Sequence, residues 1–136
     1  MNEVLRPYLV VLIGCGQMGS AIVKGLVRQR AIDPEKLICV DANLERQSSL
    51  AESLGAQAGL TAVRNHRNEK RIFLVAVKPK HVQGVIEGFQ LTELDHVVSV
   101  AAGVSMELLR GWAGNLPSVV RTSQTLHHLS VAGSLV

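Results

Sequence analysis

Residues 9–19 read LVVLIGCGQMG, in which five apolar residues run directly into a Gly-x-Gly-x-x-Gly spacing. A short, unbroken apolar run is typical of a strand that is buried on both faces. Between such a strand and a helix, Gly14 permits a tight turn, Gly16 lets the backbone approach a pyrophosphate, and Gly19 lets the helix pack closely on the strand. The stretch therefore predicts a strand, a phosphate-binding loop and the first turn of a helix, as in dinucleotide-binding domains.

Apolar runs and segments of helical spacing alternate along the rest of the chain. This alternation predicts a single α/β domain, a Rossmann-like doubly wound parallel sheet with helices on both faces. Residues 57–71 are polar and without clear period, although a third strand and helix are expected there. Further strands are expected at 37–40, 72–77 and 97–100, and helices at 18–30, 44–54, 81–89 and 105–112.

The helical spacing also predicts which side chains face the core. Met18, Leu44 and Leu108 fall on the apolar stripes of their helices, and we expect them to be buried. Gly55 is expected to end the helix at 44–54, and Ser105 to cap the start of the helix at 105–112.

The composition limits the classes of protein. A length of 136 residues with 47% hydrophobic residues suits one domain with its own core. The apolar runs are far shorter than the ~20 residues that span a bilayer, so no membrane partner is expected. Two cysteines without a zinc or disulfide spacing favour the reducing cytoplasm.

The net charge of +3 raises the question of a nucleic-acid partner. Only four aromatic residues are available to stack on bases, and the basic residues are mostly dispersed. One group of four, Arg64, Arg67, Lys70 and Arg71, is interpreted as a solvated surface turn. We expect no nucleic-acid partner, because the phosphates of a coenzyme account for a mildly basic chain.

The second predicted strand ends at Asp41, which bears on the choice of coenzyme. An acidic side chain at this place normally accepts hydrogen bonds from the adenosine ribose and repels a 2′-phosphate, which favours NAD. Asn43 and Arg46 would instead hold the 2′-phosphate of NADP if Asp41 points away. The choice between NADP and NAD stays open, as does a purely structural role for Asp41.

Two other strand ends carry residues suited to a ligand, since open α/β sheets bind ligands beyond the carboxyl ends of their strands. Residues 75–79 read VAVKP, and residues 99–103 read SVAAG, whose small side chains allow close approach of a flat ring. Cys15 lies at the start of a helix, where a lowered thiol pKa is expected, but no base neighbours it. No residue is assigned a catalytic role, and no metal site is expected.

Together these motifs resemble the amino-terminal domain of the pyrroline-5-carboxylate reductases, over about residues 9–121. The resemblance rests on GCGQMGSAIVKGL at 14–26, AVKP at 76–79 and SVAAGVS at 99–105. It implies a cytoplasmic, homo-oligomeric oxidoreductase that uses NADP or NAD to reduce the ring C=N bond of 1-pyrroline-5-carboxylate, giving proline. The coenzyme contacts expected from the resemblance and from the strand ends are Gly14, Cys15, Gly16, Gln17, Met18, Gly19, Asp41, Asn43, Ala76, Val77, Lys78, Pro79, Ala101 and Ala102.

Residues 122–136 depart from the family pattern. Where the family continues with Met-Pro-Asn-Thr-Pro, this chain reads TSQTLHHLSVAGSLV. Codons for residues 123–136 can be chosen so that an adjacent frame resembles the family segment, and a frameshift near Thr122 or Ser123 is therefore hypothesised. We expect a dinucleotide-binding domain at 1–121, an atypical tail at 122–136, no helical dimerisation domain, and negligible reductase activity of this chain alone.

Two alternative functions stay open. One is a non-catalytic remnant that binds nucleotide weakly or serves as an interaction module. The other is a different NADP-dependent reductase that shares the glycine loop, such as an F420-dependent one, against which AVKP combined with AAGVS argues.

Overall fold

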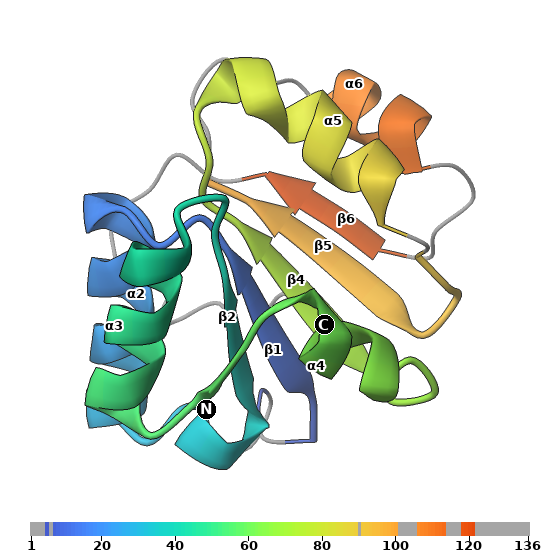
Figure 1. The fold of residues 1–136 in the computed structure, drawn as a ribbon. Coiled ribbons are helices and arrows are strands. Elements are labelled where there is room, and N and C mark those ends of the chain that lie inside the picture. The colour runs from blue at the N-terminus through green and yellow to red at the C-terminus, as the bar shows by residue number, and fades with distance from the viewer. Residues whose placement is uncertain (1–4, 6, 90, 101–105, 114–117, 122–136) are drawn as a thin grey trace.

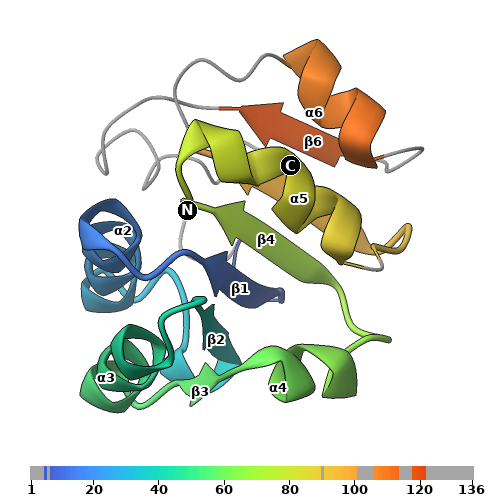
Figure 2. The same ribbon diagram turned by 45° about the horizontal axis from the view of Figure 1, so that its top comes forward.

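Figures 1 and 2 show a parallel sheet between two layers of helices. The computed structural model describes residues 5, 7–89, 91–100, 106–113 and 118–121. Six strands pair in parallel in the order β3-β2-β1-β4-β5-β6. They are β1 (Leu9–Ile13), β2 (Leu37–Val40), β3 (Gln57–Ala58), β4 (Arg71–Val75), β5 (Asp95–Ser99) and β6 (Ser118–Arg121).

Helices cover both faces of this sheet, which explains the unbroken apolar strands. On β1, Val10 and Leu12 face one core cluster, while Leu9, Val11 and Ile13 face the other, and all five are buried. The first cluster lies under α2 (Gln17–Arg28) and α3 (Leu44–Leu54), and the second under α4 (Leu60–Asn65), α5 (Pro79–Gly88) and α6 (Met106–Ala113). A short 3-10 helix, η1 (Pro34–Lys36), precedes β2.

The predicted α/β doubly wound fold is confirmed, and several elements have the predicted bounds. β1, β2 and α3 begin and end where the sequence indicates, and Gly55 ends α3 with a left-handed φ of 74°. The expected third strand and helix occur within 57–71, but β3 has two residues and α4 has six. Elements this short do not complete a recognisable period. In the part of the chain that the structure describes, none of the helices is long and apolar enough to cross a membrane.

Three predictions of buried side chains are wrong. Met18, Leu44 and Leu108 are 57%, 68% and 49% exposed. The first two lie in the opening turns of their helices, where the chain has just left the sheet and little packs over them. Ser105, the predicted cap of α6, lies outside the described residues. The buried residues of α2 are Gly19, Ile22, Val23, Gly25 and Leu26, so most of its predicted stripe does face the core.

A buried ion pair joins the starts of β4 and β5. Arg71 donates from Nε to Asp95 Oδ1 and from Nη2 to Asp95 Oδ2, both at 2.8 Å, and the two side chains are 3% and 0% exposed. Arg71 Nη1 also donates to the carbonyl oxygen of Val63 in α4 at 3.1 Å, and the guanidinium lies 4.9 Å from the centre of the Phe73 ring. The interpretation of Arg71 as part of a solvated turn is therefore wrong, because its partner is brought by strand pairing from far along the chain.

Removing one member of this pair is expected to destabilise the fold. Asp95→Ala should lower the free energy of unfolding by about 3–5 kcal/mol, because it leaves the Arg71 guanidinium buried without a counter-charge. Urea denaturation followed by circular dichroism measures the change. Glu93→Ala removes an exposed carboxylate two residues away and should shift stability by less than about 0.5 kcal/mol. Equal effects of the two substitutions would contradict the assigned role of Asp95.

Candidate coenzyme-binding site

The loop between β1 and α2 is shaped by two positions that admit only glycine. Gly14 has a φ of +103°, and a Cβ there would lie 2.7 Å from the carbonyl oxygen of Ala76, just beyond β4. A Cβ on Gly19 would lie 2.0 Å from the carbonyl oxygen of Gly14. Side chains at either position would therefore collide with backbone. The predicted roles of a tight turn and of close helix packing are matched by this geometry.

Gly16 differs from these two glycines because the space that its side chain would occupy is open. No heavy atom lies within 4 Å of a Cβ built there. Gly16 is the N-cap of α2, no side chain caps this helix, and its first turn holds no acidic residue. The unpaired N–H groups and the positive end of the helix dipole therefore face the space beside Gly16, which suits a pyrophosphate.

A cavity of about 770 Å³ extends from this loop along the carboxyl ends of the strands. It lies where the strand order changes direction, since β2 and β4 flank β1 on opposite sides, and ligands of doubly wound folds bind at such a point. Its wall includes six of the predicted residues, Gly14, Gly16, Asp41, Ala76, Val77 and Lys78, and also Ile13, Val40, Ala42, Arg46, Leu60, Lys80, His81, Gly84, Val85 and Phe89.

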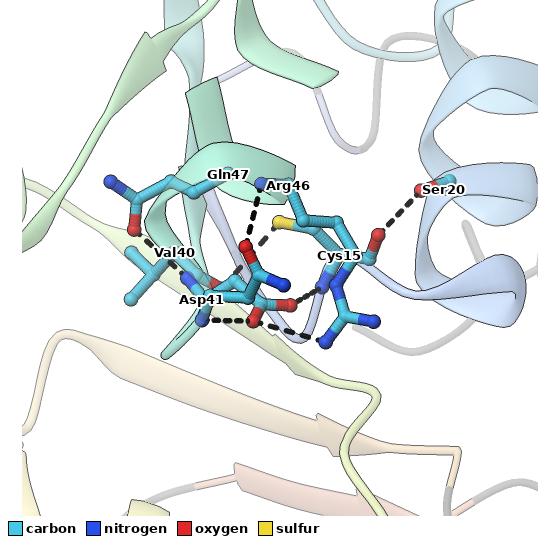
Figure 3. A network of polar contacts seen from close by, with 7 residues as sticks. Cys15, Ser20, Val40, Asp41, Arg46 and Gln47 are labelled. Atoms are coloured by element: carbon cyan, nitrogen blue, oxygen red, sulfur yellow. Dashed lines mark hydrogen bonds and ion pairs between the residues drawn. The ribbon is translucent and has the colours of Figure 1, made fainter. Parts of the chain in front are cut away.

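Asp41 connects β2 to the glycine loop through its carboxylate (Figure 3). Oδ2 accepts from the backbone N–H of Cys15 at 2.6 Å. Oδ1 accepts from the backbone N–H of Asn43 at 2.7 Å and from Nη2 of Arg46 at 3.3 Å. The backbone N–H of Asp41 donates to Gln47 Oε1 at 2.9 Å. The end of β2, the start of α3 and the glycine loop are thus held by one carboxylate.

These contacts also keep the carboxylate ionised. Burial of Asp41 opposes ionisation, but the backbone N–H groups of Asn43 and Cys15 and the Arg46 guanidinium outweigh it, and the pKa of Asp41 is lowered. Asp41 is therefore a fixed negative charge at neutral pH.

Cys15 lies beneath the loop, and the expectation of a lowered thiol pKa is wrong. Its side chain is 2% exposed, and Sγ donates to the carbonyl oxygen of Val40 at 3.6 Å. A side-chain hydrogen bond with Cys39, burial and the nearby charge of Asp41 raise the pKa of the Cys15 thiol. The helix start does not lower this pKa because the side chain is buried against β2. The backbone carbonyl oxygen of Cys15 accepts from Ser20 Oγ at 2.9 Å.

The remaining predicted residues take varied positions. Asn43 is the N-cap of α3, where its side-chain oxygen accepts from the backbone N–H of Arg46 at 3.1 Å. Gln17 and Met18 are exposed on the first turn of α2. Pro79 is the first residue of α5, after the extended N-cap Lys78. Ala101 and Ala102 lie outside the described residues.

The sequence analysis did not predict the cavity residues that come from α4, from α5 and from the residue after α5. Leu60, His81 and Phe89 come from α4, α5 and the residue after α5, and no motif in the sequence marks them. A signal did exist on α2, where Ser20, Lys24 and Arg28 follow at intervals of four and line one open cavity of about 640 Å³. Among the described residues, no group of three or more His, Cys, Asp or Glu side chains could hold a metal ion.

Comparison with known families identifies the domain. A family model described as NADP oxidoreductase, coenzyme F420-dependent, matches residues 9–103. The chain belongs to this family. The family description includes the F420-dependent reductases considered above as an alternative, whereas the individual relatives below are pyrroline-5-carboxylate reductases. Its fold, its glycine loop and the cavity at the switch point of the sheet agree with the nicotinamide coenzyme that the family description names.

Individual relatives agree with the resemblance drawn from the motifs. The chain is 33% identical over 113 residues to the pyrroline-5-carboxylate reductase of Glycine max, covering 81% of this chain and 40% of that protein. It is 28% identical over 116 residues to the enzyme of Pasteurella multocida, covering 82% and 42%. The solved structure of a pyrroline-5-carboxylate reductase from Coxiella burnetii has a TM-score of 0.72 and 26% identity, covering 85% of this chain and 43% of that one. The chain thus spans about two fifths of the length of these relatives.

The glycine geometry predicts opposite outcomes for two substitutions. Gly19→Ala should lower the free energy of unfolding by about 3 kcal/mol or more, because the new methyl group meets a backbone carbonyl that cannot move away. Gly16→Ala should change it by less than about 1 kcal/mol, because its methyl group enters open space. Urea denaturation of both variants measures the difference. Equal losses would show that the loop differs from the geometry described.

The contacts of Asp41 predict a pH-dependent contribution to stability. At pH 7, Asp41→Asn should lower the free energy of unfolding by about 1–3 kcal/mol, because all three donors lose a charged acceptor and at least one of them then faces an amide NH2 group. Since the folded-state pKa is lowered, the advantage of Asp41 is fully present above the unfolded-state pKa of about 3.9 and is lost as the pH falls through the folded-state value. Denaturation of both proteins between pH 7 and pH 2 tests this. A difference that stays constant down to pH 2 would exclude the carboxylate as its source.

Proposed function

We propose that this chain is the NAD(P)-binding domain of a pyrroline-5-carboxylate reductase. The observation that carries the proposal is the open space at Gly16, which the uncapped start of α2 faces at the switch point of the sheet. Fold and family supply the coenzyme class, and the relatives supply the reaction. In that reaction, the reduced coenzyme would supply a hydride to the ring carbon of the C=N bond of 1-pyrroline-5-carboxylate, and the ring nitrogen carries a proton taken from solvent, which together give proline and the oxidised coenzyme.

The residues of the chain would bind and orient the coenzyme. The backbone of Gly14, Cys15, Gly16, Gln17, Met18 and Gly19 would surround the pyrophosphate, with Asp41 and Asn43 on the adenosine side. Ala76, Val77, Lys78 and Pro79 would line the coenzyme at the end of β4, with Ala101 and Ala102 near the nicotinamide. Apolar neighbours such as Val77 would exclude water from this edge. None of these residues is proposed to act as an acid, a base or a nucleophile.

The substrate contacts are proposed to come from parts of the enzyme beyond residues 1–121. Accordingly, the 136-residue chain should bind coenzyme but give negligible proline-dependent reduction of NADP or NAD. Turnover by this chain would refute that assignment. The complete enzyme is proposed to be a cytoplasmic homo-oligomer, as the resemblance implies.

Coenzyme binding tests the proposal directly. Isothermal titration calorimetry of the chain should give a dissociation constant below about 1 mM for NADP, NAD or both. Gly16→Val should weaken binding by about tenfold or more, because its side chain fills the space beside the helix start and removes one or two hydrogen bonds to phosphate.

A matched control separates this effect from a general effect of replacing glycine. Gly111 of α6 also has no heavy atom within 4 Å of a built Cβ, and it lies on the helix layer of the other core cluster. Gly111→Val should leave the dissociation constant unchanged. If neither coenzyme binds to the folded chain, the alternative of a non-catalytic remnant or interaction module is favoured.

A further inference from the structure

A second cavity, of about 520 Å³, lies between α4 and α5, and the proposed function does not use it. Both helices pack over the second core cluster, so this cavity lies on one face of the sheet. It reaches Arg71, the first residue of β4, and none of residues 14–19 lines it, which places it toward the amino ends of the strands. We call it the α4–α5 cavity, and its wall includes Leu60, Arg64, Arg67, Arg71, Gly88 and Phe89.

The α5 side of this cavity is open because two residues of the helix have no side chain there. Gly84 and Gly88 both line the cavity, and their spacing of four places them on the same face of α5. No heavy atom lies within 4 Å of a Cβ built at either position. A glycine in a helix is less stable than an alanine, and no close contact among the described residues requires one here. The space over these glycines is therefore large enough for part of a ligand.

Apolar side chains border the same space. Leu60 is 48% exposed, and Val85 and Phe89 are partly buried. The Phe89 ring packs edge-on against Phe73 of β4, with ring centres 5.2 Å apart, so the core supports it from behind. An aromatic group placed over the glycines can pack against these side chains. A volume of about 520 Å³ lies in the range of small-molecule sites.

Three arginines line the α4–α5 cavity, and none of the described residues on its wall is acidic. Arg64 in the last turn of α4 and Arg67, two residues after this helix, are exposed. Arg71 is buried, and its charge is balanced by Asp95. Three of its five N–H groups donate to Asp95 and Val63, and the other two have no acceptor among the described residues. The cavity thus holds positive charge at its opening and spare donors inside.

The acidic side chains nearby have other partners. Glu69 contacts His66, Glu87 accepts from Gln83 at 3.4 Å, and Asp95 accepts from Arg71 and from the backbone N–H of Thr92. In the described part of the chain, no carboxylate forms an ion pair with Arg64 or Arg67. The two exposed guanidinium groups therefore remain free to bind an anion.

We propose that the α4–α5 cavity is a second ligand site, beside the coenzyme site, and that it takes a flat aromatic organic anion. The aromatic part lies over Gly84 and Gly88 against Phe89, and the anionic group binds Arg64 and Arg67. The proposal goes beyond the proposed function, because none of the residues assigned to the coenzyme lines this cavity. The two cavities meet at a shared wall made by Leu60, Gly84, Val85 and Phe89.

Two fluorescent probes that differ in charge test the proposal. They are 1-anilinonaphthalene-8-sulfonate and N-phenyl-1-naphthylamine, which has the same rings without the sulfonate. In fluorescence titrations of the 136-residue chain, the sulfonate probe should bind at least about tenfold more tightly than the neutral probe. The double variant Arg64→Ala/Arg67→Ala should weaken the sulfonate probe by about tenfold or more and change the neutral probe by less than about threefold.

A matched double variant controls for the loss of two charges. Arg28→Ala/Arg110→Ala removes two exposed arginines from α2 and α6, away from the α4–α5 cavity, and should leave the affinity of both probes unchanged. If it weakens the sulfonate probe as much as Arg64→Ala/Arg67→Ala does, the probe responds to net charge alone and the proposal is wrong.

A second pair of variants tests where the probes bind. Gly88→Leu places a side chain in the α4–α5 cavity and leaves the coenzyme cavity unchanged, because Gly88 lines only the former. It should weaken both probes by about tenfold or more. Gly111→Leu adds the same side chain at an open position of α6 and should leave both affinities unchanged. Leucine favours a helix more than glycine does, so both variants should stay folded, which circular dichroism checks.

Titration in the presence of coenzyme distinguishes the two sites. With NADP or NAD at saturating concentration, the dissociation constant of the sulfonate probe should change by less than about threefold. Displacement of the probe by either coenzyme would make the cavity part of the coenzyme site and overturn the proposal. Equal affinity for the two probes, or unchanged binding in Gly88→Leu, would also overturn it and leave the proposed function intact. If neither coenzyme binds, the proposed function fails, and the titrations without coenzyme still decide whether the second site exists.

Discussion

The fit of Gly19 against the carbonyl oxygen of Gly14 sets the geometry on which the site depends. Because a Cβ at position 19 would lie 2.0 Å from that oxygen, the first turn of α2 meets the end of β1 with no side chain between them. This contact brings the start of a 12-residue helix to the point where the sheet reverses its strand order. The open space at Gly16 lies between these two close contacts, at the start of the helix.

The two ends of the sheet have different physical tasks. At the amino ends of β4 and β5, Arg71 and Asp95 form a buried, bidentate pair that also reaches α4. At the carboxyl ends, backbone N–H groups and the charges of Arg46 and Lys78 face a cavity. At the amino ends of the strands, polar groups are paired with each other inside the protein and stabilise the fold. At the carboxyl ends, polar groups face a cavity in which a ligand can bind.

Local patterns in the sequence predict the parts of this fold that local rules determine. The bounds of β1, β2 and α3 follow from apolar runs, helical spacing and a glycine end, and the glycine loop follows from its spacing. What depends on residues far apart in the chain could not be predicted in this way. The partner of Arg71 is 24 residues away, and the donors to Asp41 come from both sides of β2. The same holds for the Cys15 thiol, whose surroundings depend on how β2 packs beneath the loop.

The hydrogen bond from the Cys15 backbone to Asp41 has a consequence for how such a site can change over time. It makes the end of β2 a structural support of the glycine loop as well as part of the wall of the 770 Å³ cavity. A lineage that replaced Asp41 to alter its coenzyme would disturb the loop that every nucleotide coenzyme shares. The Arg46 side chain lies at the protein surface and makes one long hydrogen bond to Asp41, so it does not support the loop directly. A substitution at Arg46 would therefore leave the glycine loop in place, whereas a substitution at Asp41 would remove one of its supports.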